Sequence, residues 1–464
     1  MKCKLLFLSL LAFYSLLFAS LLQAQDKPNL VLIIADDATY RDLEVYGGQA
    51  KTPHMNALAK ESLKFNQCFQ AAPMCSPTRH NLYTGIYPVK SGAYPNHTYI
   101  KEGVKSLPHY LKPLGYRVAL SGKTHINPKD QFPFEYSDRP SPDGGNPRGD
   151  PDFDAIDQLF KESKEAETPF CLIIASKEPH GPLNRGDPSI YPPESLKLRP
   201  FHVDTPEFRS EFSKYLAEIT VFDEQVGEAL GLLDKHGLKE NTLFVVLSEQ
   251  GNAFSRAKWS CYEDGVKSGC IVRWPGKTKP GTETDAAIEY VDIVPTFLEA
   301  AGADIPDVLD GKSFVPVLTG EADDHKEYVY ALHTTLGIQN NGGAFGIRTV
   351  RSSKYRYILN TNPENQFKCA VDRGKWMQSW MAKAEAGDKH AIEYVGRHRN
   401  RPEVELYDVA NDPDNIHNLA DDSKYIAVKA SLRARLDSWM NEQGDLGRET
   451  ELTAETRLFK NRDK

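Results

Sequence analysis

Pro28-Asn29-Leu30-Val31-Leu32-Ile33-Ile34-Ala35-Asp36-Asp37 is the stretch that decides the fold. Its aliphatic run is typical of a parallel strand that is buried on both faces. Two carboxylates follow at the carboxyl end of the strand, where open α/β sheets bind their ligands. Adjacent carboxylates repel each other unless a cation lies between them, so Asp36 and Asp37 predict a site for a hard divalent metal. A solvated loop or a helix cap is the alternative for such a pair.

Three further apolar runs of the same kind end in polar residues. The runs, each with its polar residues, are Tyr116–Leu120 with Lys123 and His125, Phe170–Ala175 with His180, and Thr242–Leu247 with Glu249 and Gln250. Because parallel strands align their carboxyl ends, these side chains should gather at the edge that carries Asp36 and Asp37. A long amphipathic helix pattern over Phe208–His236 lies between the last two runs. The order of strands and helices predicts an α/β fold with a doubly wound mixed sheet flanked by helices.

A cysteine motif stands between the first and second of these strands: Met74-Cys75-Ser76-Pro77-Thr78-Arg79-His80-Asn81-Leu82-Tyr83-Thr84-Gly85. Pro77 suits the first turn of a helix and Gly85 its end, so Cys75 should lie at the helix N-terminus. Unpaired amides and the helix dipole favour a thiolate there, and Arg79, one turn further on, adds positive charge. The pattern predicts a nucleophilic cysteine with a lowered pKa. A buried thiol or half of a disulfide is the alternative.

Cys75-Ser76-Pro77-Thr78-Arg79, followed by Leu82-Tyr83-Thr84-Gly85, resembles the signature of the type I sulfatases. In that family the cysteine is oxidised after translation to formylglycine, whose hydrate attacks the sulfuryl group. Further matches extend the resemblance from Pro28 to about Leu419. The resemblance implies an alkaline-phosphatase-like core, hydrolysis of sulfate esters, a calcium ion, and a separate formylglycine-generating maturation enzyme.

The same resemblance implies a role for each polar position. The implied metal ligands are Asp36, Asp37, Cys75, Glu249 and Gln250; Lys123 and Lys258 would bind sulfate, with Arg79 steadying the nucleophile, His125 acting as base in sulfate release and His180 as acid for the leaving group. His97 is a candidate substrate contact, or simply a packed loop histidine.

One departure from the family pattern concerns the metal site. Most sulfatases have Asp followed by His or Asn where this chain has Glu249 and Gln250. Both side chains keep oxygen donors that suit calcium, but each is one methylene longer. A degenerate site in a non-catalytic homologue is the alternative.

The amino terminus resembles an export signal. Lys2 and Lys4 precede an apolar run from Leu5 to Leu22, and a small residue, Ala24, stands before a polar stretch. We expect a signal peptide over residues 1–24 and a periplasmic or secreted protein without stable membrane insertion; an uncleaved anchor is the alternative. The net charge is −8 and no basic block is present, which argues against a nucleic-acid partner.

The rest of the chain predicts a catalytic domain over residues 25–325 and a smaller C-terminal α+β subdomain over residues 326–464. The subdomain should hold an antiparallel sheet packed by one helix, with a frayed tail after Glu442. The stretch Asp130–Asp154 is expected to be a long surface loop. Five cysteines remain besides Cys3 and Cys75, an odd number, and a bridge between Cys261 and Cys270 is one possibility.

An exported enzyme with long polar loops resembles the sulfatases that act on sulfated carbohydrates, including the heparan N-sulfatase branch. The expected partner is therefore a sulfated saccharide that carries either a sulfate ester or an N-sulfate. Two alternatives remain open: a phosphonate or phosphate monoester hydrolase of the same fold, and a glycan-binding pseudoenzyme.

Overall fold

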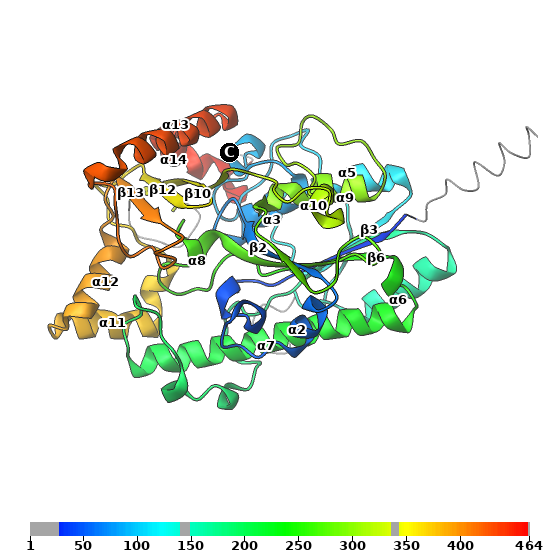
Figure 1. The fold of residues 1–464 in the computed structure, drawn as a ribbon, viewed down its shortest axis with the longest axis horizontal. Helices are drawn as coiled ribbons and strands as arrows, with labels where there is room; N and C mark the ends of the chain where they lie inside the picture. The colour runs from blue at the N-terminus through cyan, green and yellow to red at the C-terminus, as the bar shows by residue number, and fades with distance from the viewer. Residues whose placement is uncertain (1–26, 140–148, 336–342, 463–464) are drawn as a thin grey trace, which may run out of the picture.

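The computed structural model describes residues 27–139, 149–335 and 343–462. The expected signal peptide, residues 1–24, lies outside the described residues. Two separate β-sheets organise the described chain, and helices surround them (Figure 1).

The larger sheet has nine strands in the order β4-β3-β5-β1-β6-β7-β2-β8, with β9 paired to β2. The bounds are β1 Asn29–Ile34, β2 Leu63–Phe69, β3 Arg117–Gly122, β4 Glu135–Ser137, β5 Phe170–Ala175, β6 Thr242–Leu247, β7 Lys267–Arg273, β8 Thr282–Thr284 and β9 Ile288–Glu289. Strands β4, β3, β5, β1 and β6 run parallel, whereas β7 is antiparallel to both β6 and β2. The predicted mixed, doubly wound sheet is confirmed.

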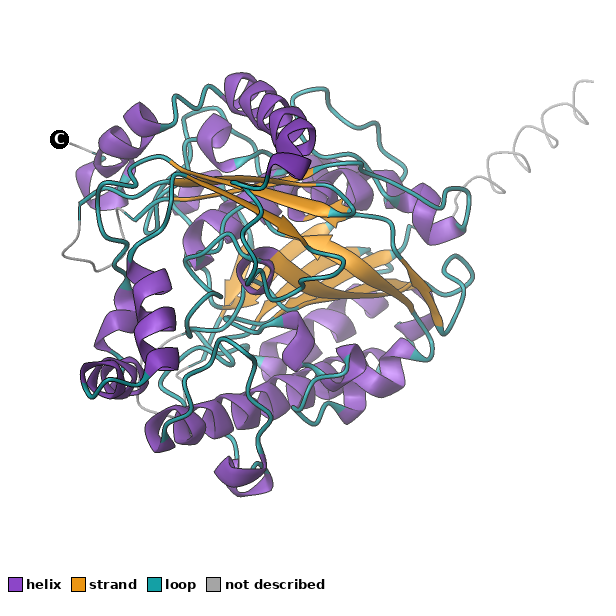
Figure 2. Cartoon of the chain, turned by 60° about the vertical axis from the view of Figure 1, so that its left-hand side comes forward, coloured by secondary structure: helices purple, strands orange, loops and turns teal. Residues whose placement is uncertain are grey.

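Helices cover both faces of this sheet (Figure 2). One face packs on α2 (Pro53–Ala59), α6 (Phe153–Glu165) and α7 (Pro206–Lys235); the other packs on α3 (Cys75–Thr84), α5 (Leu107–Leu111), α9 (Ile293–Ala300) and α10 (Val315–Thr319). Alternate residues of β1 serve the two cores: Val31 and Ile33 belong to the first, Leu32 and Ile34 to the second. Burial on both faces explains why β1 is an unbroken apolar run.

The smaller sheet is antiparallel, in the order β10-β11-β12-β13. Its strands are Val329–His333, Ile347–Arg351, Tyr355–Asn360 and Val404–Asp408. Helix α13 (Ile426–Gln443) packs on it, and its Trp439 stacks on Tyr330 with ring centroids 5.1 Å apart. This sheet and helix agree with the sequence prediction. The sequence did not predict the two helices that lie between β12 and β13, which are α11 (Lys375–Glu385) and α12 (Lys389–Arg399). The ring centroid of Trp380, on α11, lies 5.2 Å from that of Phe208 on α7.

The expectation of a frayed tail is wrong. The chain continues after α13 through α14 (Arg448–Thr453) and two short 3-10 helices, Ala454–Arg457 and Phe459–Asn461. Glu451 is fully buried and accepts hydrogen bonds from Thr335. Charged side chains in this stretch make tertiary contacts. Composition alone would suggest that they are solvated.

Three other expectations can be compared with the fold. The stretch Asp130–Asp154 is only partly loop, because β4 adds to the edge of the large sheet and α6 begins at Phe153. Cys261 and Cys270 form no bridge; both are free, buried thiols. Within the described ranges, no helix combines the length and the apolar character that crossing a bilayer requires.

Candidate active site

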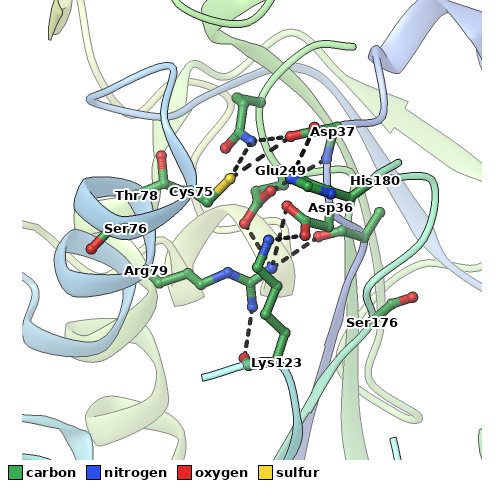
Figure 3. A network of polar contacts seen from close by, with 12 residues as sticks. Asp36, Asp37, Cys75, Ser76, Thr78, Arg79, Lys123, Ser176, His180 and Glu249 are labelled. Carbon is green, nitrogen blue, oxygen red and sulfur yellow. Dashed lines mark hydrogen bonds and ion pairs between the residues drawn. The ribbon is translucent and has the colours of Figure 1, made fainter. Parts of the chain in front are cut away.

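Four parallel strands deliver the polar side chains to one edge of the large sheet (Figure 3). Asp36 and Asp37 follow β1, Lys123 follows β3, His180 follows β5, and Glu249 follows β6. Asp37 and Glu249 have left-handed backbones, with φ of 73° and 65°. This strained conformation turns both carboxylates toward the same point.

The carboxylates form a cluster around Cys75. One ligand atom each from Asp36, Asp37, Cys75 and Glu249 lies within 4.8 Å of the others, and all four residues are buried. The Gln250 amide donates to Asp37 Oδ1 at 2.6 Å, which leaves its carbonyl oxygen without a hydrogen-bond partner in the described chain.

This donor set fits calcium. Calcium takes six to eight oxygen ligands in a flexible geometry, and the three carboxylates supply oxygens only. The Gln250 amide turns its nitrogen toward Asp37 and Cys75, and exchanging its nitrogen and oxygen by a half-turn of the amide would add a fourth oxygen donor. Asp36 Oδ1 likewise lacks a hydrogen-bond partner among the described residues; its separation from the Arg79 guanidinium is 3.9 Å. Buried oxygens without donors are the feature a cation would satisfy.

Three basic side chains neutralise the carboxylates. Lys123 pairs with Asp36, Lys258 Nζ lies 2.6 Å from Asp37 Oδ1, and Arg79 lies 2.8 Å from Glu249 Oε1. Burial alone would raise the pKa of Asp36, but Lys123 and the neighbouring positive groups outweigh it and hold that pKa well below its usual range. The pKa of Glu249 is raised because burial outweighs the attraction of Arg79.

The predicted low pKa of Cys75 is wrong. Cys75 does begin α3, but its side chain is only 3% exposed, and burial raises the pKa of the thiol to about 12 despite the positive charges of Lys123 and Lys258. The helix terminus is too weak to overcome desolvation together with two adjacent carboxylates. A protonated thiol is a poor nucleophile, so Cys75 as encoded is unsuited to attack.

The three histidines occupy different places. His180 Nε2 lies 3.9 Å from Asp37 Oδ2, beside the cluster. His125 Nε2 instead hydrogen-bonds with Nδ1 of His97 at 3.0 Å, which puts His97 at the rim with its side chain exposed. The surrounding protein and the charge of Lys123 lower the pKa of both His125 and His180.

Some positions near the cluster were not anticipated from the sequence. Asn96 Oδ1 accepts from the backbone N–H of Ser76 at 3.4 Å, in the first turn of α3. Tyr290 OH accepts from the backbone N–H of Glu249 at 3.0 Å. Neither residue has a role predicted from the sequence, and only the three-dimensional structure shows that they contact Ser76 and Glu249.

Comparisons with known proteins agree with this geometry. A model of the sulfatase family matches residues 28–303, and a model of the C-terminal region of N-sulphoglucosamine sulphohydrolase matches residues 254–375. An ulvan-active sulfatase of Formosa agariphila is 35% identical over 91% of this chain and 81% of its own length. Human N-sulphoglucosamine sulphohydrolase is 25% identical, with 93% of each chain covered.

Solved structures show the same fold. The structure of BT4656 in complex with its substrate D-glucosamine-2-N,6-O-disulfate superposes with a TM-score of 0.70 at 19% identity, covering 90% of this chain and 99% of that one. The matches define the class of this protein, which is a hydrolase. More particularly, the chain belongs to the sulfatase family, and the resemblance found in the sequence is confirmed.

Proposed function

We propose that this sulfatase hydrolyses sulfate esters of sulfated carbohydrates with a formylglycine made from Cys75 and a calcium ion. The observation that carries the proposal is the buried cluster of Asp36, Asp37 and Glu249 around Cys75, flanked by Lys123 and Lys258. The carbohydrate substrate is supported by relatives that act on ulvan and on sulphated glucosamine. An N-sulfate is included among the candidate substrates because of the match to the C-terminal model.

Conversion of Cys75 would replace a thiol that burial keeps protonated with a different nucleophile. It is a two-electron oxidation in which Cβ loses its sulfur as sulfide and becomes an aldehyde carbon, with the electrons passing to an oxidant such as dioxygen through the maturation enzyme. When present, the hydrated aldehyde supplies a nucleophilic oxygen and calcium supplies positive charge to the sulfuryl oxygens. Asp36, Asp37, Glu249 and the Gln250 carbonyl would hold that calcium.

The chain's own side chains bind the sulfuryl group and move the protons. Lys123 and Lys258 are aimed at the cluster and would bind sulfuryl oxygens, which concentrates positive charge where negative charge develops. His180 lies beside the cluster and would donate a proton to the departing sugar oxygen as its bond to sulfur breaks. His125 would accept a proton during sulfate release, with His97 orienting its ring through their hydrogen bond.

The proposed place of action is the periplasm or the exterior of the cell. The supporting feature is the Lys2–Ala24 pattern of charge, apolar run and small residue.

The experiment joins mass spectrometry to a sulfate-release assay. The protein is produced with a formylglycine-generating system, and the tryptic peptide that contains Cys75 should lose about 18 Da, the difference between thiol and aldehyde. The converted protein should release sulfate from at least one member of a panel of O-sulfated and N-sulfated saccharides, and Cys75→Ala should release none. Full conversion without release from any saccharide, or faster cleavage of matched phosphate esters, contradicts the proposal.

A further inference from the structure

The C-terminal segment, residues 448–462, lies against the loop that carries His97. Thr98 and Leu458 form an antiparallel bridge, and the Phe459 N–H donates to the His97 carbonyl at 2.9 Å. The red segment beside the C label in Figure 1 is this part of the chain. The tail therefore reaches the side of the active site where His97 pairs with His125.

Several side-chain contacts fix the segment in place. The Arg457 guanidinium donates to the carbonyls of Gly92 and Tyr99, both at 2.8 Å, and lies 4.1 Å from the centre of the Tyr99 ring. Thr98 is fully buried, and its hydroxyl donates to the Arg457 carbonyl at 2.9 Å. Such contacts determine where the next residues lie.

The two residues after Leu458 expose an aromatic ring and an ammonium beside the loop of His97. Phe459 is 40% exposed although its backbone is held, and its ring meets that of Tyr99 edge-on with centroids 6.4 Å apart. Lys460 is exposed and forms no ion pair with any described residue. An exposed aromatic ring packs on the apolar face of a sugar, and an unpaired ammonium attracts an anionic group.

Lys460 acts on the same histidine as the two candidate sulfate-binding lysines. Burial is the main cause that lowers the pKa of His97, and the positive charges of Lys123, Lys258 and Lys460 lower it further. A polyanionic saccharide with its sulfate between Lys123 and Lys258 would thus place neighbouring groups within the field of Lys460.

We propose that His97, Phe459 and Lys460 form a subsite for a second anionic group, a carboxylate or a further sulfate, on the saccharide that carries the scissile sulfate. The subsite rests on the proposed function, since it would bind another part of the same saccharide. It gives the enzyme a preference for polyanionic saccharides over sugars with a single sulfate.

The test compares Lys460→Gln with the matched surface control Lys389→Gln, both with Cys75 converted. The substrates are the panel saccharide cleaved fastest by the wild type, its carboxyl-reduced form, its form without the second sulfate, and 4-nitrophenyl sulfate, which has no sugar. Lys460→Gln should raise KM for the intact saccharide about fivefold with kcat unchanged, as expected for one exposed ion pair. The effect should vanish for whichever altered form has lost the anionic group, and 4-nitrophenyl sulfate should not respond.

A binding measurement distinguishes the loss of one substrate contact from a general loss of activity. In Cys75→Ser protein, titration calorimetry with the intact saccharide should show weaker, less salt-dependent binding for Lys460→Gln and no change for Lys389→Gln. Unchanged KM and affinity in Lys460→Gln overturn the subsite and leave the sulfatase intact. If the converted wild type releases sulfate from no saccharide, the proposed function fails and the subsite fails with it.

Discussion

Lys258 shows how a single side chain prepares the pocket for an anion. Its ammonium is almost fully buried and forms a short ion pair with Asp37. Burial alone would lower the pKa of Lys258, but the charge of Asp37 outweighs burial and raises it. Lys258 therefore stays charged. A buried cation beside the cluster costs no reorganisation when negative charge develops on the substrate.

Replacing this lysine should therefore slow the chemistry more than it weakens binding. We expect Lys258→Gln to lower kcat about 100-fold with a smaller change in KM, the usual loss for one preorganised charge donor. Initial rates of sulfate release across substrate concentrations measure the change, with Lys161→Gln on the exposed side of α6 as the control. A Lys258→Gln variant with wild-type kcat would contradict a role for Lys258 in the reaction.

Gln250 is one of the two positions in the metal site at which this chain departs from the family pattern. Its carbonyl oxygen has no hydrogen-bond partner among the described residues and would become a metal ligand after a half-turn of the amide. In Cys75→Ser protein, calcium should raise Tm because only the folded state assembles the donor set. Gln250→Ala should require about tenfold more calcium for the same rise, since one oxygen ligand is lost. Scanning fluorimetry of EDTA-treated protein over a series of calcium concentrations would measure the rise in Tm, with magnesium as the control. Identical calcium titrations of Gln250→Ala and the parent protein would contradict a role for Gln250 as a metal ligand.

At the scale of elements, the buried strands are the parts that the sequence predicts best. The runs Phe170–Ala175 and Thr242–Leu247 match β5 and β6 residue for residue, because burial on both faces imposes a local apolar pattern. The carboxyl-edge rule then gathers Asp36, Lys123 and His180 without further information.

Long-range packing limited the prediction elsewhere. The raised pKa of Cys75 depends on desolvation by segments far away in the chain, and the His97–His125 pair joins two loops. Helix α11 packs on α7 and α12 packs on α11, whereas the segment after α13 contacts the loop of His97. No local periodicity encodes such contacts.

One contact between elements gives a stability prediction. Asp223 of α7 accepts the backbone N–H groups of His54 and Met55, at 2.9 and 2.8 Å, at the N-terminus of α2. Asp223→Ala leaves these helix-end donors unpaired, so the free energy of unfolding should fall by about 1–2 kcal/mol. Urea unfolding would measure it against Glu224→Ala, whose side chain is exposed; equal midpoints for both variants would contradict the capping role.

At the scale of the whole molecule, a pair of buried carboxyls links the loop of His180 to α7. Glu178 Oε1 lies 2.6 Å from the Arg185 guanidinium, which also pairs with Asp150. Glu218 accepts a hydrogen bond from the backbone N–H of Arg185. Burial and the proximity of Glu218 raise the pKa of Glu178 to about 8.

The sign of the resulting pH dependence follows from linkage. The folded protein keeps the Glu178 proton up to about pH 8, whereas the unfolded chain releases it at an ordinary carboxyl pKa of about 4.3, so this group's contribution to stability is lost as pH rises between these values. Tm should fall from about pH 5 to about pH 8.5, and Glu178→Gln should flatten that fall, while exposed Glu194→Gln should leave it unchanged. If Tm falls with pH as steeply in Glu178→Gln as in the wild type, a group other than Glu178 causes the fall.

The bridge between Thr98 and Leu458 also bears on the order in which the molecule is made. Tyr94 and Thr450, which meet through a hydrogen bond beside this bridge, are 356 positions apart in the chain. During synthesis the cysteine helix emerges early, while the segment that closes this side of the pocket emerges long afterwards. The interval would give a formylglycine-generating enzyme time to reach a thiol that the finished fold leaves only 3% exposed. Slowing translation between these two regions should increase the converted fraction of Cys75, and speeding it should decrease that fraction.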